Sequence, residues 1–112
     1  MSLEEADQFH RRGVLAQNKA AQAMGRLLAL AEQRDSGQIR RIVQFLASTY
    51  NGEDFPWDPF DLRTVDVGIG DDMLLCLDTL RWGKADLHKL VPDGERRILA
   101  VMKQWGLKWP ER

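Results

Sequence analysis

Carboxylate side chains, which can bind cations or cap helices, are concentrated in one stretch of this sequence. Residues 51–80 hold eight acidic side chains against one basic side chain, Arg63, which gives a net charge of −7. Carboxylate oxygens bind hard cations such as Ca²⁺ and Mg²⁺. The segment lacks the ordered ligand spacing of an EF-hand, and no phosphate-binding loop accompanies it. We therefore expect no metal site among Glu53, Asp54, Asp58, Asp61, Asp66, Asp71 and Asp72.

The acidic segment has three other interpretations. Aspartates are favoured at helix starts, where they cap amide groups and offset the helix dipole, so we expect Asp58 and Asp66 to serve as caps. Exposed carboxylates can also imitate nucleic acid and compete for a groove built for phosphates. Finally, they can border a surface for a protein partner. The residues of that candidate partner surface are Trp57, Asp58, Asp61, Asp66, Asp71 and Asp72.

Basic side chains suggest contact with nucleic acid. Residues 1–50 hold seven basic and five acidic groups, net +2, and residues 81–112 hold eight and four, net +4. The whole chain is nevertheless at −1, and we see no compact helix-turn-helix signature. Solvated helix faces explain these charges more simply. The candidate basic patch comprises Arg40, Arg41, Arg81, Lys84, Arg96 and Arg97.

Catalysis has little support in the sequence. His10 and His88 stand far apart, and neither has a recognisable nucleophile or metal partner beside it. Cys76 lies on an apolar helix face, where an inert core thiol is expected. The serines lie in no nucleophile-elbow pattern. We expect a protein that is not an enzyme and that binds no cofactor.

The elements that position these residues are predicted to be helices. The 112 residues are 44% hydrophobic and 29% charged, which suits one globular domain. Apolar residues recur at helical spacing, and the brief alternation at residues 65–69 is too short for a sheet. The expected elements are a polar helix or frayed lead-in over residues 1–13, helices over 14–34, 37–50 and 66–82, a short helix within 84–90, a last helix from Pro92 to Trp105 and a tail at 107–112.

The apolar faces of these helices predict how they pack. Val14, Ala21 and Met24 share one face of the first long helix, although Gly13 and Gly25 weaken it. The helix over 66–82 is apolar over much of its circumference, so we expect it at the centre of the molecule. Within the loop over 53–62, Phe60 should point inward. The fold class predicted is all-α, a single compact bundle of four to five helices with a packed loop rich in proline and aromatics.

The chain shows no signal for export or membrane insertion. No apolar run approaches the roughly 20 residues that span a bilayer, and the first residues lack the apolar stretch of a signal peptide. The one cysteine cannot form a disulfide within the chain. We expect a cytoplasmic protein without membrane contact.

Spaced short motifs over residues 26–105 resemble a family. The motifs are Arg34-Asp35-Ser36-Gly37-Gln38, Phe45-Leu46, Phe60-Asp61-Leu62, Val65-Asp66 and Asp71-Asp72-Met73. This pattern is similar to a domain of unknown function found in short proteobacterial proteins, often carried on plasmids and integrative elements. The chain departs from it at Thr49-Tyr50 and Thr64-Val65, where the family tends to have tryptophan.

The resemblance implies a small accessory protein from mobile DNA and brings no activity or catalytic residue. Our leading expectation is a non-enzymatic protein that acts by binding another protein. One alternative is a nucleic-acid-associated regulator that uses the basic helices. Another is an inhibitor of a host nucleic-acid-processing or defence complex that acts through the acidic segment. The sequence leaves the partner's identity and the oligomeric state open.

Overall fold

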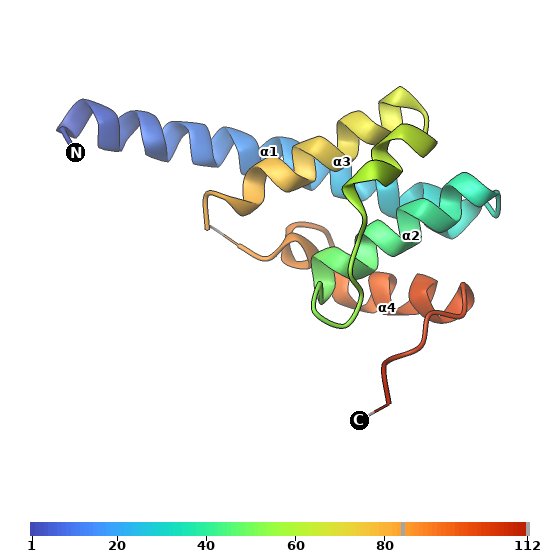
Figure 1. Cartoon of the computed structure of the whole chain (residues 1–112). Helices are drawn as coiled ribbons and strands as arrows, with labels where there is room; N and C mark the ends of the chain where they lie inside the picture. The colour runs from blue at the N-terminus through green and yellow to red at the C-terminus, as the bar shows by residue number, and fades with distance from the viewer. Residues whose placement is uncertain (84, 112) are drawn as a thin grey trace.

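The computed structural model describes residues 1–83 and 85–111, and within these ranges every regular element is helical. This confirms the predicted all-α class. Figure 1 shows the arrangement. The elements are α1 (Leu3–Gln33), α2 (Gly37–Tyr50), η1 (Pro59–Thr64), α3 (Val67–Leu80), η2 (Leu87–Leu90) and α4 (Gly94–Gln104), of which η1 and η2 are 3₁₀ helices.

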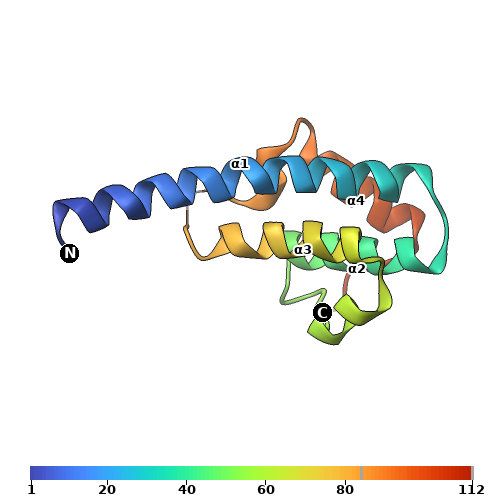
Figure 2. The ribbon, with the colours of Figure 1, turned by 90° about the horizontal axis from the view of Figure 1, so that it is seen from above.

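Helix α1 is the element on which the others assemble. It contacts α2, α3, η2 and α4, and it runs beside α3 in both ribbon views (Figures 1 and 2). Its buried stripe is rich in alanine, which lets neighbouring backbones approach closely. The predicted stripe was partly wrong, because Val14 is 42% exposed and Ala21 is only half-buried. The buried residues are Gly13, Ala16, Ala20, Ala23, Met24, Leu27, Leu28 and Ala31.

Helix α3 lies beside α1, so the expectation that it forms the centre was wrong. Met73 and Cys76 are fully buried, whereas Leu74 and Leu80 are about half exposed. Only one side of α3 is covered, because α2 and α4 pack with each other and with α1 on the other side of the molecule. Because α3 is apolar over more of its circumference than its neighbours cover, some of its leucines stay exposed.

The bounds of α2 match the prediction. Its apolar stripe faces the core, where Ile39, Val43 and Leu46 are buried. Ser36 occupies the N-cap position without a hydrogen bond from its side chain to the helix. Its carbonyl oxygen instead accepts from the backbone N–H of Ile39.

The loop between α2 and α3 is packed, with one exception. The Asp58 carboxylate accepts a hydrogen bond from the backbone N–H of Phe60, so the predicted cap of η1 is confirmed. Trp57 contacts Phe45 edge-on, with ring centroids 5.0 Å apart. Phe60 is 67% exposed, however, and contradicts the expectation that it points inward. Its ring lies against the guanidinium group of Arg63 instead.

The first turns of α1, residues 3–15, form an arm. The arm extends beyond the body of the molecule, which comprises the described residues from Ala16 onward. Helix α1 passes through Gly13 without a break, so the expected frayed lead-in is replaced by a continuous helix. The hydroxyl of Ser2 caps it by accepting from the N–H of Glu5. The first turns of the arm project past the other elements in Figures 1 and 2, and its base lies over the end of α3. It raises the radius of gyration to 14.8 Å, against about 13 Å for a compact chain of this length.

Candidate functional site

The acidic residues predicted to form one partner surface fall into two groups. Asp66, Asp71 and Asp72 line a cleft of about 830 Å³ between α1 and the start of α3. Trp57, Asp58 and Asp61 line a second cleft of about 360 Å³ beside α2. Among the described residues, no group of three or more histidine, cysteine and acidic side chains is arranged to hold a metal ion.

Most of these acids make contacts within the protein. Asp72 accepts three hydrogen bonds from Arg26 of α1, with a shortest distance of 2.7 Å, and this interaction raises the pKa of Arg26. Asp61 lies 3.6 Å from Arg41 of α2. The Gln38 side chain donates through Nε2 to the Asp66 carboxylate and accepts through Oε1 from the Asp66 backbone N–H. Asp66 stands at the N-cap position of α3 without a hydrogen bond from its side chain to the helix, so the expected side-chain cap there was wrong: its carboxylate is held by Gln38 instead. The charge separation seen in the sequence thus becomes a set of contacts between elements.

The predicted basic patch is distributed over three elements. Arg40 and Arg41 belong to α2, Arg81 follows α3, and Arg96 and Arg97 belong to α4, whereas Lys84 lies outside the described residues. Arg81 pairs with Asp78, and Arg96 pairs with Asp93. These pairings leave less uncompensated positive charge than the sequence suggested.

Arg97 makes the most enclosed of these basic contacts. Two of its nitrogens donate to the two oxygens of Glu32, at 2.7 and 3.0 Å, so they join α4 to α1. This hydrogen bonding lowers the pKa of Glu32 and raises that of Arg97. Bidentate geometry of this kind holds a guanidinium group in one orientation. Arg97 therefore has a structural role, in which it links α4 to α1.

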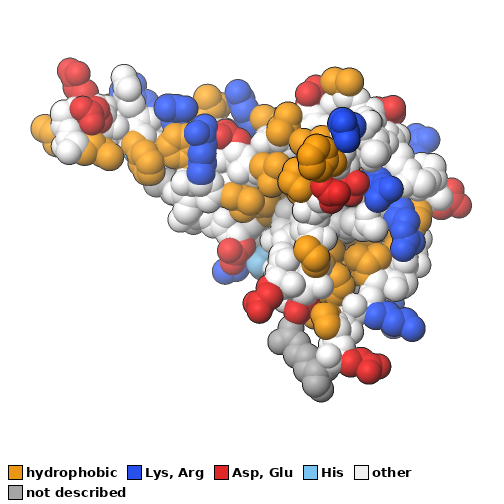
Figure 3. All heavy atoms as spheres, viewed as in Figure 1, with side chains coloured by type: hydrophobic (Ala, Val, Ile, Leu, Met, Phe, Trp, Pro, Cys, Tyr) orange, Lys and Arg blue, Asp and Glu red, His pale blue; other side chains and the backbone are white. Residues whose placement is uncertain are grey.

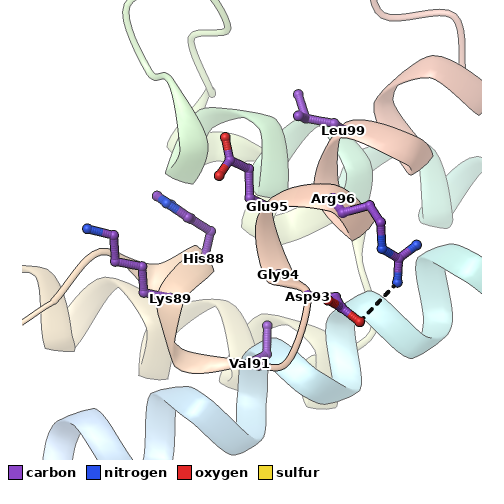
Figure 4. A pocket seen from close by; sticks show the side chains of 8 residues that line it. All are labelled: His88, Lys89, Val91, Asp93, Gly94, Glu95, Arg96 and Leu99. Carbon is purple, nitrogen blue, oxygen red and sulfur yellow. Dashed lines mark hydrogen bonds and ion pairs between the residues drawn. The ribbon is translucent and has the colours of Figure 1, made fainter.

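A shallow hollow of about 670 Å³ lies where η2 meets the start of α4 (Figure 4). His88 and Lys89 enter it from η2, and Glu95 enters from α4. The Glu95 carboxylate accepts a hydrogen bond of 2.7 Å from the Tyr50 hydroxyl, which raises the pKa of that phenol. His88 contacts the Tyr50 ring edge-on. The polar groups of this hollow therefore connect α2, η2 and α4, and they form no arrangement of nucleophile and base.

The remaining nucleophile candidates lie apart. Cys76 is fully buried, and burial raises the pKa of its thiol to about 12. His10 lies on the exposed arm, and His88 lies on η2. A thiolate needs a lowered pKa and access to solvent in order to react, and Cys76 has neither.

The junction of the arm with the end of α3 is a site that sequence reasoning missed. Two guanidinium groups lie over the Trp82 ring, with Arg12 at 5.2 Å and Arg81 at 5.0 Å from the ring centroid. Phe9 meets the same ring edge-on at 5.0 Å. We name Phe9, Arg12, Arg81 and Trp82 the arm junction. The predicted break at Gly13 concealed it, because the break separated Phe9 and Arg12 from the helix that carries them.

Exposed apolar side chains accompany this junction. Figure 3 shows hydrophobic side chains gathered along the arm and over α3. On the arm, Leu3 is 92% exposed, and Leu3, Ala6, His10 and Val14 follow one another at helical spacing on one face. We name these four residues the arm stripe. The arm stripe stays uncovered in the single chain, because its residues precede the part of α1 that packs against the other helices.

Comparison with known families identifies the chain. The model of a family described as "Family of unknown function (DUF7673)" matches residues 21–106, and the chain belongs to this family. The match covers the body and leaves the arm stripe outside it. Neither the curated proteins nor the solved structures contained a match to this chain.

Proposed function

We propose that this protein is a non-enzymatic accessory protein that binds another protein through its arm. The observation that carries the proposal is the exposure of large apolar side chains on the part of α1 that projects past the other helices, with Leu3 and Val14 on the arm stripe. Burial of such side chains against a partner releases about 25 cal/mol for each Å² of apolar surface removed from water.

The arm junction supports the same proposal. Trp and Arg are enriched among the residues that dominate protein-binding energies, and the Trp82 ring contacts Arg12 and Arg81 at the base of the arm. Leu15 and Leu80 are both about half exposed and lie on the elements that meet at this junction. The junction therefore combines an aromatic ring, cationic groups and neighbouring apolar side chains in one place.

The setting of the protein also belongs to this proposal. The family resemblance implies a bacterial, mobile genetic element as its source, and we propose that it acts in the cytoplasm. In the described chain, no helix combines the length and apolarity that crossing a bilayer requires. The genes that surround its own would test the source directly.

Affinity capture with paired variants tests binding through the arm. The double substitution Leu3→Ser with Val14→Ser removes the apolar side chains of the arm stripe without touching the buried core. Leu74→Ser is the matched control, because Leu74 is also about half exposed but lies on α3. We expect one specific protein, which includes the case of an untagged second copy of this chain, to be captured by the wild type and by Leu74→Ser and to be lost with the arm variant. Equal capture by all three proteins would contradict the proposal.

The two alternative functions predict different results. A regulator that uses the basic helices would shift duplex DNA in a gel, and the shift would weaken strongly between low and moderate salt. An inhibitor that acts through the acidic segment would bind a nucleic-acid-processing complex and would lose it when Asp58, Asp61 and Asp66 become asparagine. We expect neither result, because Asp58 caps η1 and Asp61 lies near Arg41.

A further inference from the structure

We propose that the partner of the arm is a second copy of this chain, with the two arms side by side and antiparallel. This inference rests on the proposed function, because it names the occupant of the arm stripe. It is carried by a self-complementary pattern of charge and apolar side chains along the arm.

The apolar part of the pattern is symmetric about one point on the helix. Leu3 and Val14 lie at the two ends of the arm stripe, and the point midway between them falls between Gln8 and Phe9. In an antiparallel pair with its two-fold axis at this point, Leu3 of one copy lies level with Val14 of the other. Both side chains, which are exposed in the single chain, then become covered.

The charged part of the pattern is symmetric about nearly the same point. Asp7 and Arg11 lie on one flank of the arm stripe, and the position midway between them is Phe9. In the single chain they form an exposed ion pair with a distance of 2.6 Å. An antiparallel two-fold pair places the same flank of both copies together, so Asp7 of each copy lies opposite Arg11 of the other. Such complementarity fixes register and orientation.

A parallel pair would lose this complementarity. A two-fold axis parallel to the helices brings the flank with Asp7 and Arg11 against the opposite flank, which carries Phe9 and Gly13. Phe9 is already in contact with Trp82 at the arm junction. The parallel arrangement would also place Leu3 beside Leu3 and leave Val14 level with Val14, where the body begins to widen. The antiparallel arrangement is therefore the one that the charges favour.

The body leaves room for this pairing. The axis between Gln8 and Phe9 brings residue 3 of the partner level with Val14, and the first fully covered core residues of α1 follow from Ala16 onward. At 1.5 Å per residue the shared length is about 17 Å. This contact is short compared with interfaces of about 1,200–2,000 Å² in stable complexes, so the association should depend on concentration.

Sedimentation velocity of the full chain tests self-association, at concentrations from about 5 to about 500 μM. We expect the sedimentation coefficient of the wild type to rise toward a dimer over this range. The substitutions Asp7→Arg and Arg11→Asp should each weaken association at least about tenfold, because each sets like charges against each other. An equimolar mixture of the two variants should associate again, because positions 7 and 11 then carry opposite charges across the interface.

Cysteine cross-linking tests the orientation. Leu3→Cys mixed with Val14→Cys should give a disulfide-linked heterodimer on mild oxidation, and neither variant alone should cross-link. The native Cys76 is buried and does not compete. Cross-linking of Leu3→Cys with itself would overturn the antiparallel arrangement, as would failure of the mixed charge variants to associate.

Two further outcomes separate this inference from the proposed function. A chain that stays monomeric at all concentrations, with capture of a different protein still lost in the arm variant, overturns the second copy as the partner and leaves the proposed function in place. A monomeric chain with capture unaffected by the arm variant overturns both.

Discussion

At the scale of single residues, the carboxylates divide into those that stabilise the fold and those that face solvent. The adjacent pair Asp71 and Asp72 shows the division. Asp72 is only 13% exposed at its side chain and holds Arg26 through two oxygens, whereas Asp71 is exposed. The sequence places both aspartates near the start of the same helix, and only the position of α1 distinguishes them.

We predict that Asp72→Asn lowers the free energy of unfolding by about 1 kcal/mol, because it weakens a bidentate, partly covered ion pair between α1 and α3. Chemical denaturation measures the change. Asp71→Asn is the matched control and should change stability by less than about 0.5 kcal/mol. Equal effects of the two substitutions would show that Arg26 contributes nothing specific.

We predict that the thiol of Cys76 does not react with a thiol reagent in the native protein and reacts fully in denaturant. Burial raises the pKa of Cys76 to about 12, so the thiolate is disfavoured in the folded state. Colorimetric titration of the thiol with and without denaturant checks this. Rapid reaction of the folded protein at pH 8 would contradict it.

The same raised pKa predicts how stability depends on pH. Above the ordinary pKa of the thiol, near 9, the unfolded chain loses this proton while the folded chain keeps it up to about 12. Fewer protons are then bound in the unfolded state, so stability falls as pH rises through this window, by up to about 1.4 kcal/mol per pH unit. Denaturation of the wild type and of Cys76→Ala between pH 8 and 10.5 should show a steeper decline for the wild type.

At the scale of elements, the ends of the helices decide how closely neighbours approach. Helix α4 begins at Gly94, directly after Asp93, whose backbone is left-handed with a φ of 55°. A Cβ atom at Gly94 would lie 1.9 Å from the carbonyl oxygen of His88. The glycine is therefore required where the start of α4 packs against η2.

We predict that Gly94→Ala destabilises the protein by about 3 kcal/mol, because backbone atoms must move to admit the methyl group. Gly25→Ala is the matched control. Gly25 lies inside α1 with open space around its Cβ position, so alanine there should stabilise the helix by about 0.5–1 kcal/mol. Thermal denaturation of both variants compares them, and the prediction fails if their effects share a sign.

At the scale of the whole molecule, the arm and the body are separable. The buried core contains residues of all four α-helices and begins at Ala16 on α1. The arm contributes the contact of Phe9 with Trp82 and the approach of Arg12 to the same ring. The body should therefore fold without the arm and lose the binding that we propose for the arm stripe.

We predict that a chain lacking residues 1–12 remains helical and melts within about 5 °C of the full chain, because little buried apolar surface is removed. Circular dichroism with a thermal ramp measures both properties. Leu27→Ala in the full chain is the control for core damage, since Leu27 is fully buried and its truncation should cost about 2–5 kcal/mol. An unfolded truncated chain would show that the arm is part of the core.

The sequence by itself determined the helical class, the limits of α2 and the cap of η1, because these depend on spacing and on contacts between near neighbours such as Asp58 and Phe60. It also indicated that Cys76 is a core thiol. Two sequence predictions were wrong. Phe60 was expected to point inward but is exposed, and α3 was expected at the centre but is covered on one side only.

Only the tertiary structure decided which apolar face finds a partner within the chain. Helical periodicity gives the direction of a side chain relative to its own helix, but burial depends on which other helix lies there. Leu3 and Val14 are of residue types that are common in protein cores, but they are exposed because α1 extends past its neighbours at this end. The exposure of the arm stripe and the contacts of the Trp82 ring with Arg12 and Arg81 thus depend on where α1 begins and α3 ends relative to each other.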